Sequence, residues 1–367
     1  MERLDAAVVG AGAVGLAVAA RLAASGRQVV VVERHGRHGL EASSRSSEVI
    51  HAGIYHPPGS LKSRLGVEGR RRIYELAQRL GFFALKTGKL IVACEGSELA
   101  ALEGLFKRGC ENGVEGLSLA DRAAIQAKAP GLSAVAAIWS VETGIMDTEE
   151  LMRCELKLAQ DRGAIFLFGH ELRGVEPRPD GYRLWTSGEA EPFEARCVVN
   201  AAGLNSDRVA ELAGIDAAAA GYRLHWLKGE YFSIRKALDI QTLVYPLPTA
   251  LALGIHLTVD RQGRHRLGPN ALPVQSLDYD VDPSHRELFW RQARRYLPAL
   301  RPEDLSPGTS GIRAKLSTGG QFRDFVIAEE SARGLPGWVN LICIDSPGLT
   351  ASPAIAELVA NLLEWPA

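Results

Sequence analysis

The chain has 367 residues, of which 46% are hydrophobic and 23% are charged, so it is long enough for two intertwined domains and has the composition of a folded globular protein. Its formal net charge of -1 gives no general positive field, which excludes nucleic-acid or anionic-lipid binding driven by overall charge. The five cysteines are odd in number and never spaced as Cys-x-x-Cys, which argues against a disulfide framework or a zinc site and favours a reducing, cytoplasmic location.

Residues 6–20 form an uncharged run rich in Ala, Val and Gly that resembles a secretion signal. The run is too short to span a bilayer, and its glycines have dinucleotide-loop spacing, which favours a buried strand, turn and helix. No other stretch of the sequence is long and apolar enough for a transmembrane helix. We therefore expect no membrane span, and a peripheral membrane contact stays open.

The first elements predict a β-α-β unit. An apolar strand over residues 4–9 leads into GAGAVG, a helix that ends at Gly26 follows, and the β-branched run 28–33 is typical of a strand buried on both faces. Gly10, Gly12 and Gly15 permit a tight turn, close approach of a pyrophosphate and close packing of helix on strand. Glu33 ends the second strand, where its carboxylate can accept a hydrogen bond from a ribose hydroxyl. Together these features predict a dinucleotide site with phosphate at the helix N-terminus.

A Ser-rich segment over residues 41–60 interrupts the unit before a predicted helix from about Leu61 to Leu80. A nicotinamide-dependent dehydrogenase would normally complete its β-α-β series at once. Here the insert could lead the chain under the pyrophosphate and alongside an isoalloxazine ring. The interrupted topology therefore favours FAD over NAD.

The remaining elements alternate in type along the chain. Strands are expected over 84–93, helices over 97–128 and 147–162, and further strands from Ile165 to Val199, the last of which should return to the nucleotide sheet. Residues 221–272 predict an antiparallel sheet whose open face can roof a substrate. A helix over 283–297, two more strands and a final helix over 353–363 complete the series, and the last strand and helix should rejoin the nucleotide domain.

Several segments carry a family resemblance. They are Glu33-Arg34, SSRSSEVIHAGIYHPPGSLKS at 43–63, TGKLIVA at 87–93, ETGIMD at 142–147, VVNAAG at 198–203, KGEYF at 228–232, YPLP at 245–248, LGIHLT at 253–258, LGPNA at 267–271 and SGIRAK at 310–315. In this order they resemble the D-amino acid oxidase superfamily of FAD-dependent enzymes, and within it the L-2-hydroxyglutarate dehydrogenases. The resemblance implies an α/β fold with a split Rossmann-type FAD-binding domain, residues 1–83, 142–220 and 305–367, and an α+β substrate domain with a mixed or antiparallel sheet, residues 84–141 and 221–304.

The resemblance also implies a set of FAD contacts. They are Gly10, Gly12, Val14, Gly15, Glu33, Arg34, Ser43, Ser46, Ser47, Val175, Ala202, Gly203, Gly311, Gly348, Leu349 and Thr350. Ser46 and Ser47 could equally be turn or cap residues. Residues 345–350 (DSPGLT) precede the last helix, whose N–H groups and dipole could stabilise negative charge on the flavin, with an ordinary helix cap as the alternative.

Oxidation of an α-hydroxy acid needs a cation for the carboxylate and a base for the hydroxyl proton. Arg313 is the predicted clamp, because a guanidinium group binds a carboxylate bidentately and the resembling family places this position facing the flavin; a surface salt bridge is the alternative. His51 and His256 each lie in an apolar run and titrate near pH 6.5. We expect His256 to be the base and His51 a flavin-side or substrate contact, with structural histidines as the alternative. His51 also stands where some relatives join the flavin covalently.

A dicarboxylate would need a second cation, for which Lys62, Lys228, Lys315 and His225 are the candidates. The chain departs from the family pattern at Tyr55-His56, where two tyrosines are usual, and at Lys315, where a neutral amide is usual. Both Tyr55 and Lys315 are expected to contact the substrate.

The leading hypothesis is an FAD-dependent enzyme that oxidises a small L-2-hydroxy acid, L-2-hydroxyglutarate or a relative, to the 2-oxo acid by hydride transfer to flavin N5. The alternatives are an amine-oxidising member of the superfamily acting on a glycine-, sarcosine- or proline-like substrate, a non-catalytic FAD-binding protein, and an exported binding protein. Oxygen, a quinone or another flavoprotein are the candidate electron acceptors.

Overall fold

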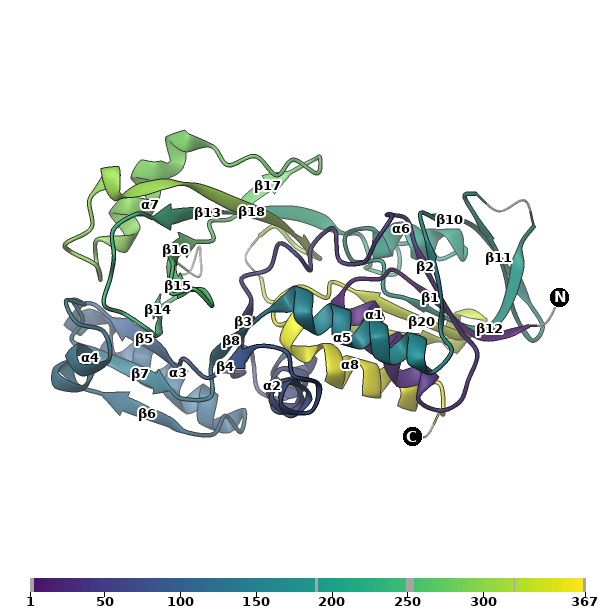
Figure 1. Cartoon of the computed structure of the whole chain (residues 1–367), viewed down its shortest axis with the longest axis horizontal. Coiled ribbons are helices and arrows are strands. Elements are labelled where there is room, and N and C mark those ends of the chain that lie inside the picture. The colour runs from purple at the N-terminus through teal and green to yellow at the C-terminus, as the bar shows by residue number, and fades with distance from the viewer. Residues whose placement is uncertain (1–2, 189–190, 249–253, 320, 366–367) are drawn as a thin grey trace.

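The computed structural model describes residues 3–188, 191–248, 254–319 and 321–365. Figure 1 shows two parts: one holds the first and last elements of the chain, and the other holds most of its middle. No helix in these residues combines the length and hydropathy needed to cross a membrane.

An eight-stranded sheet forms the first part. Its strands run in the order β10 (Leu172–Arg178), β11 (Gly181–Thr186), β12 (Phe193–Asn200), β1 (Leu4–Val9), β2 (Val29–Glu33) and β9 (Ile165–Phe168), with β20 (Leu335–Ile342) beside β12 and β19 (Val326–Glu330) beside β20. The pairings among β9, β2, β1, β12 and β20 are parallel. The predicted return of β12 and β20 to the nucleotide sheet is thus confirmed.

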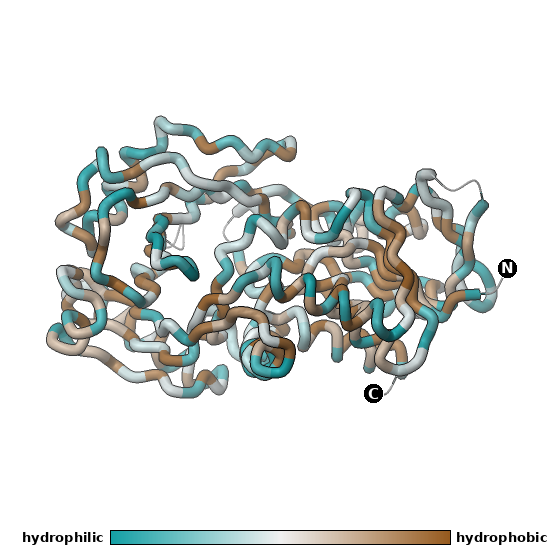
Figure 2. The backbone as a smooth tube through the Cα atoms, viewed as in Figure 1, coloured by the Kyte–Doolittle hydropathy of each residue, from teal (hydrophilic) through white to brown (hydrophobic). Residues whose placement is uncertain are grey.

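Three helices cover one face of this sheet. They are α1 (Ala13–Ala23), α5 (Thr148–Asp161) and α8 (Gly348–Leu362), which lie together in Figure 1. All five residues of β2 are buried because strands covered by helices lose contact with water. Figure 2 shows that hydrophobic residues are concentrated in the central strands of this sheet.

A nine-stranded sheet forms the second part. Its order is β17 (Leu272–Val274), β13 (His225–Ile234), β16 (His265–Gly268), β15 (His256–Val259), β14 (Leu243–Pro246), β5 (Lys89–Ala93), β7 (Ala136–Ser140) and β6 (Leu117–Ala120), and β18 (Leu305–Lys315) also pairs with β13. The sheet is mixed, because β14 pairs with β5 in parallel while its other pairings are antiparallel.

The other elements connect these two sheets or cover them. A small sheet of β3 (Val49–Ile50), β8 (Gly144–Met146) and β4 (Ala84–Leu85) joins them, and the remaining helices are α2 (Leu61–Leu80), α3 (Leu99–Glu111), α4 (Arg122–Lys128), α6 (Ser206–Leu212) and α7 (Arg286–Ala293). Short 3₁₀ turns occupy Gly96–Glu98, Gly203–Asn205, Pro283–His285, Pro302–Asp304 and Ser331–Arg333. The predicted α/β class with a mixed-sheet second domain is confirmed.

Three element predictions need correction. The expected helix over 97–128 is divided by β6, because Leu117–Ala120 pairs with β7 and this pairing outweighs local helix propensity. The expected helix over 283–297 is limited to α7. The last helix begins at Gly348, before Pro353. Pro353 has no N–H for the carbonyl of Leu349, and the Ser352 hydroxyl donates to that carbonyl instead, at 2.9 Å.

Residues 305–315 lie in a different sheet from the one that the expected domain division implies. The division places residues 305–315 in the FAD-binding domain, but β18 pairs with β13 from Leu305 opposite Ile234 to Lys315 opposite His225. The strand that carries Arg313 therefore belongs to the nine-stranded sheet.

Candidate active site

The loop between β1 and α1 is shaped by glycines. Gly10 has φ +105°, and a Cβ on it would lie 2.6 Å from the Ala201 carbonyl oxygen. A Cβ on Gly15 would lie 1.9 Å from the Gly10 carbonyl oxygen, so α1 packs against the loop only when this residue is glycine. The two glycines thus let the loop pack closely against Ala201, which follows β12, and against α1.

Glu33 holds this loop at the end of β2. Its carboxylate accepts hydrogen bonds from the N–H groups of Ala11 (2.8 Å) and His35 (2.9 Å). A carboxylate has about four lone-pair sites, so both oxygens can still accept from ribose hydroxyls. Arg34, also a predicted contact, pairs with Glu41 at the edge of the same cavity.

A cavity of about 360 Å³ lies at this loop. Among the predicted FAD contacts, its lining includes Gly10, Gly12, Val14, Glu33, Arg34, Ser43, Ala202 and Gly203. Val175 does not line it: this residue lies in β10 and packs against the core, and Leu172 and Arg173 of the same strand line the cavity instead. The cradle left by the glycines, with a carboxylate at the end of β2, fits the pyrophosphate and ribose of a dinucleotide such as FAD.

The Ser-rich segment runs from this cavity to a second one. The Ser43 hydroxyl accepts from the N–H of Ala13 at 3.0 Å, so Ser43 caps α1 across the loop. The Ser46 hydroxyl accepts from the N–H of Glu48 at 3.2 Å, which is the turn role considered for it. The Ser47 carbonyl accepts from Arg266 of β16 at 2.8 Å, which fixes the segment to the nine-stranded sheet.

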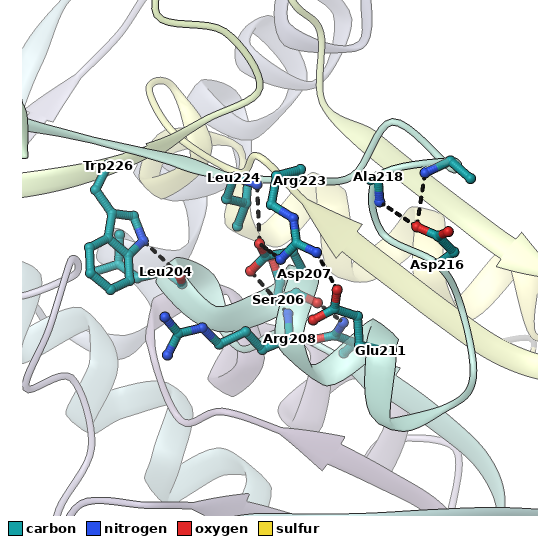
Figure 3. Close-up of polar contacts among 12 residues, drawn as sticks. Leu204, Ser206, Asp207, Arg208, Glu211, Asp216, Ala218, Arg223, Leu224 and Trp226 are labelled. Atoms are coloured by element: carbon teal, nitrogen blue, oxygen red, sulfur yellow. Dashed lines mark hydrogen bonds and ion pairs between the residues drawn. The ribbon is translucent and has the colours of Figure 1, made fainter. Parts of the chain in front are cut away.

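The two cavities are continuous in their lining. They share Val14, Ala42, Ser43, Gly203, Leu204 and Ile344. The turn that carries Gly203 and Leu204 lines both cavities, and Figure 3 shows the polar contacts that hold it against β13. The indole N–H of Trp226 donates to the Leu204 carbonyl at 3.0 Å, and Asp207 accepts from the N–H of Leu224 at 3.1 Å. The two cavities therefore adjoin each other at these shared residues, Leu204 among them.

The second cavity, of about 280 Å³, brings together the predicted catalytic residues. Its lining includes Ser46, Ser47, His51, Tyr55, His256, Gly311, Arg313, Lys315, Gly348 and Leu349. Thr350 lies behind the lining, where its hydroxyl accepts from the N–H of His51 at 3.1 Å and donates to the Val49 carbonyl at 3.2 Å. Thr350 thus positions the backbone of His51.

A hydrogen bond to one nitrogen of its guanidinium group fixes Arg313. Its Nη2 donates to the Asn270 carbonyl at 3.0 Å, and its Nε is buried without a hydrogen-bond partner in the described part of the chain. Asn270 is itself fixed, because its side chain accepts from the Glu230 N–H and donates to the Glu230 carboxylate. Gly229 lets β13 pack closely against the turn that carries Asn270, since a Cβ there would lie 2.7 Å from the Cβ of Pro269.

The two histidines are close enough to interact electrostatically. Burial, with further contributions from Lys89, His56 and His256, holds the pKa of His51 well below its usual range, so His51 is neutral at physiological pH. The His256 ring is buried and stacks on the Tyr245 ring, with centroids 3.6 Å apart. The neutral imidazole of His51 can accept a hydrogen bond in the cavity.

The candidates for a second cation have carboxylate partners or lie apart from the cavity. Lys62 donates to Asp345 at 2.6 Å, and Lys315 pairs with the other oxygen of the same carboxylate. Lys228 pairs with Asp278 at 2.8 Å. His225 is exposed at the start of β13, outside the cavity lining.

Sequence reasoning missed Lys89, Tyr231 and Tyr245, all of which line the cavity. Lys89 is 1% exposed, and burial lowers its pKa to about 7. A signal was present in the sequence: a lysine begins an otherwise apolar strand, KLIVA, whose five residues are all buried. A charged side chain is almost never fully buried unless it is paired.

Comparison with known proteins gives consistent results. Residues 5–362 match the family described as FAD dependent oxidoreductase (DAO). The chain is 37% identical to the mitochondrial L-2-hydroxyglutarate dehydrogenase of Arabidopsis thaliana, covering 98% of this chain and 83% of that protein, and 30% identical to the human protein of the same name, covering 97% and 88%. Among solved structures, an FAD-bound L-α-glycerophosphate oxidase from Mycoplasma pneumoniae is similar with a TM-score of 0.89 and 26% identity, covering 100% of this chain and 96% of that one.

Proposed function

We propose that this chain, which belongs to the DAO family of FAD-dependent oxidoreductases, oxidises a small L-2-hydroxy acid, L-2-hydroxyglutarate or a close relative, to the 2-oxo acid. The observation that carries the proposal is the meeting of Arg313, His51 and His256 in one cavity that is continuous with the dinucleotide cavity. The substrate names of the two dehydrogenase relatives support it.

The glycine loop, Glu33 and Ser43 are the residues that we expect to hold the adenosine and pyrophosphate of FAD, and Ser46, Ser47, Gly311, Gly348 and Leu349 line the space for its ring. When bound, FAD supplies a hydride acceptor at N5. Domain boundaries follow the expected division, with β18 moved to the substrate domain.

Arg313 binds the carboxylate next to the reacting carbon in this proposal. Its Nε is a buried donor in need of an acceptor, and a guanidinium edge matches the two oxygens of a carboxylate. His256 takes the hydroxyl proton, and His51 supports it as a neutral neighbour in the cavity wall. The Nε of Arg313 and the side chain of His256 are both buried, and the lower local dielectric strengthens both interactions.

A substrate panel tests the proposal. Purified holoenzyme is mixed without oxygen with L-2-hydroxyglutarate, its D-enantiomer, L-glutamate, glycine, sarcosine, L-proline and glycerol 3-phosphate, and the loss of flavin absorbance near about 450 nm is recorded. We expect L-2-hydroxyglutarate alone to give rapid loss. Loss with the amines alone would establish the amine-oxidising alternative, and no loss with any compound would favour a non-catalytic FAD-binding protein.

The electron acceptor and the location belong to the same proposal. We infer a cytoplasmic protein, in keeping with the free thiols of all five cysteines. Oxygen, a quinone and another flavoprotein are the acceptors to compare, by following reoxidation of the reduced enzyme with each. Cell fractionation tests the location, and recovery in a membrane pellet that salt releases would indicate peripheral attachment.

A further inference from the structure

Lys89 lies in a strand between two others in the cavity wall. β5 pairs with β14 on one side and β7 on the other, and Lys89 is opposite Leu243 and Ser140. Its Nζ is 4.8 Å from the ring centroids of both Tyr55 and Tyr245. The two aromatic rings therefore hold the ammonium group at the cavity surface through cation–π contacts.

Lys89 has no counter-ion among the residues that the structure describes. Each lysine considered above as a second anchor, Lys62, Lys228 and Lys315, has a carboxylate within salt-bridge distance, whereas none pairs with Lys89 in this part of the chain. A buried ammonium group without a counter-ion is costly, and the cost falls when an anion enters the cavity. Burial therefore leaves Lys89 ready to bind a negative charge.

A second donor lies in the same wall. The Tyr55 hydroxyl is buried without a hydrogen-bond partner in the described residues. Burial holds the pKa of Tyr55 well above its usual range, so the hydroxyl keeps its proton at neutral pH. An ammonium group and a hydroxyl group are both donors, as a carboxylate requires.

Lys89 and Arg313 belong to different ends of one lining. Arg313 lies in β18 and Lys89 in β5, and Tyr231 of β13 and Tyr245 of β14 line the cavity wall on the strands between them. All four residues line the same cavity. For a substrate with a carboxylate at each end, the lining of this one cavity thus holds a cation for each carboxylate.

We propose that Lys89, assisted by the Tyr55 hydroxyl, binds the distal carboxylate of a dicarboxylic 2-hydroxy acid and so makes the site selective for dicarboxylates. This inference rests on the proposed function, since Arg313 is taken to bind the other carboxylate. Lys89 is a specificity residue, and it contacts the end of the substrate away from the reacting carbon.

Ligand binding tests this role separately from turnover. Glutarate and pentanoate have five carbons, lack an oxidisable hydroxyl group and differ in the distal carboxylate alone. Their dissociation constants are measured calorimetrically with the holoenzyme for the wild type, Lys89→Met, Lys89→Arg and Tyr55→Phe. Lys128→Met is the matched control, because Lys128 also makes a cation–π contact, 4.0 Å from the Trp139 centroid, but is exposed and outside the cavity lining.

We expect Lys89→Met to weaken glutarate binding roughly 10- to 100-fold and to leave pentanoate binding within about twofold. Lys89→Arg retains most of the affinity for glutarate, Tyr55→Phe loses part of it, and Lys128→Met matches the wild type. Equal glutarate affinity in Lys89→Met and the wild type would overturn the inference. If Lys89→Met does not fold, unchanged glutarate affinity in Tyr55→Phe together with a preference for pentanoate in the wild type would overturn it.

Turnover distinguishes the two proposals. With L-2-hydroxyglutarate and L-2-hydroxypentanoate as substrates, Lys89→Met should lose the preference for the dicarboxylate mainly through KM, because the reacting carbon is still held by Arg313. Failure of the wild type to oxidise either acid would overturn the proposed function. The glutarate measurements would still decide whether Lys89 binds a carboxylate.

Discussion

The imidazole ring of His256 stacks on the phenol ring of Tyr245, with centroids 3.6 Å apart and planes 8° from parallel. The two residues lie in neighbouring antiparallel strands, β15 and β14, so the sheet itself sets the ring separation. Tyr245 also contacts Lys89, and it therefore touches both the candidate base and the candidate distal anchor.

Replacement of Tyr245 by alanine should lower kcat/KM up to about 10-fold, because His256 loses the ring that fixes its plane. Tyr245→Phe keeps the stack and should stay near the wild-type value. Steady-state kinetics on both variants checks this. A Tyr245→Phe enzyme as impaired as Tyr245→Ala would mean that the hydroxyl matters more than the stack.

Arg313→Met should lower kcat/KM about 100-fold or more while FAD stays bound, because the carboxylate loses its charged partner in a buried setting. Arg313→Lys keeps the charge but lacks the paired donors, so its kcat/KM should lie between those of Arg313→Met and the wild type. Arg264→Met is the control, since Arg264 pairs with Asp260 on an exposed turn. Flavin absorbance and rapid-mixing reduction provide the readouts. Flavin reduction at the wild-type rate in Arg313→Met would mean that Arg313 does not bind the substrate carboxylate.

Gly15→Ala should destabilise the protein by about 3 kcal/mol and lower FAD affinity, because the new Cβ would lie 1.9 Å from the Gly10 carbonyl oxygen. Gly104→Ala is the matched control in α3: it is exposed, a Cβ added there would meet no atom within 4 Å, and the change should stabilise the protein by about 0.5–1 kcal/mol. Chemical denaturation and FAD titration measure both effects. An unchanged Gly15→Ala variant would contradict the packing described for this loop.

Dicarboxylate binding should weaken as pH rises above about 7, the value to which burial lowers the pKa of Lys89. The ammonium form binds the carboxylate, so above this pH each binding event must also take up a proton, and the dissociation constant rises up to about tenfold per pH unit. The titratable groups near Lys89 include Tyr55, Tyr245 and His51, and His256 stacks on Tyr245.

Lys89→Arg separates these contributions, because arginine stays charged and should flatten the rise. Glutarate titrations from about pH 6 to about pH 9 in buffers of different ionisation enthalpy report both affinity and proton uptake. A pH profile that is identical in the wild type and Lys89→Arg would assign the dependence to another group.

The buried carboxyl group of Glu155 leads to a separate prediction about stability. Its side chain is buried in α5, its Oε2 has no hydrogen-bond partner in the described residues, and burial raises its pKa from 4.5 to about 8. The folded protein therefore keeps a proton that the unfolded chain releases, so the free energy of unfolding falls as pH rises from about 4.5 to about 8.

Glu155→Gln removes this dependence and should raise stability by about 1–3 kcal/mol at pH 8, with a smaller gain at pH 5. Glu103→Gln, at an exposed position in α3, should change little at either pH. Thermal unfolding at the two pH values measures the difference. A gain for Glu155→Gln that is larger at pH 5 would reverse the assigned sign.

The strongest sequence predictions came from local backbone requirements and continuous buried strands. Gly10, Gly12, Gly15 and Glu33 act within one β-α-β unit, so their spacing is enough to place them. β6 could not be found in this way, because Leu117–Ala120 becomes a strand only through its pairing with β7. The position of β18 depends likewise on its partner β13, far away in the sequence.

In the site, residue type identified Arg313, His51 and His256 as candidates, and the fold brings them to one cavity. The partners of the lysines could not be read from the sequence. Asp345 pairs with two candidates for the second anchor, Lys62 and Lys315, from a loop about 280 and 30 residues away, whereas Lys89 is left without a carboxylate among the described residues. Charge pairing across the fold, and not the presence of a lysine, decides which cation can bind a ligand.

The carboxylate shared by Lys62 and Lys315 has one more consequence. Burial opposes its ionisation, but the two ammonium groups lower the pKa of Asp345, so the carboxylate stays charged at neutral pH and joins the start of α2, which carries Lys62, to the end of β18, which carries Lys315. Lys315 is 31% exposed, whereas Lys62 is buried, so only one of the two ion pairs meets solvent. Rising ionic strength should therefore weaken the contact to Lys315 more than the contact to Lys62.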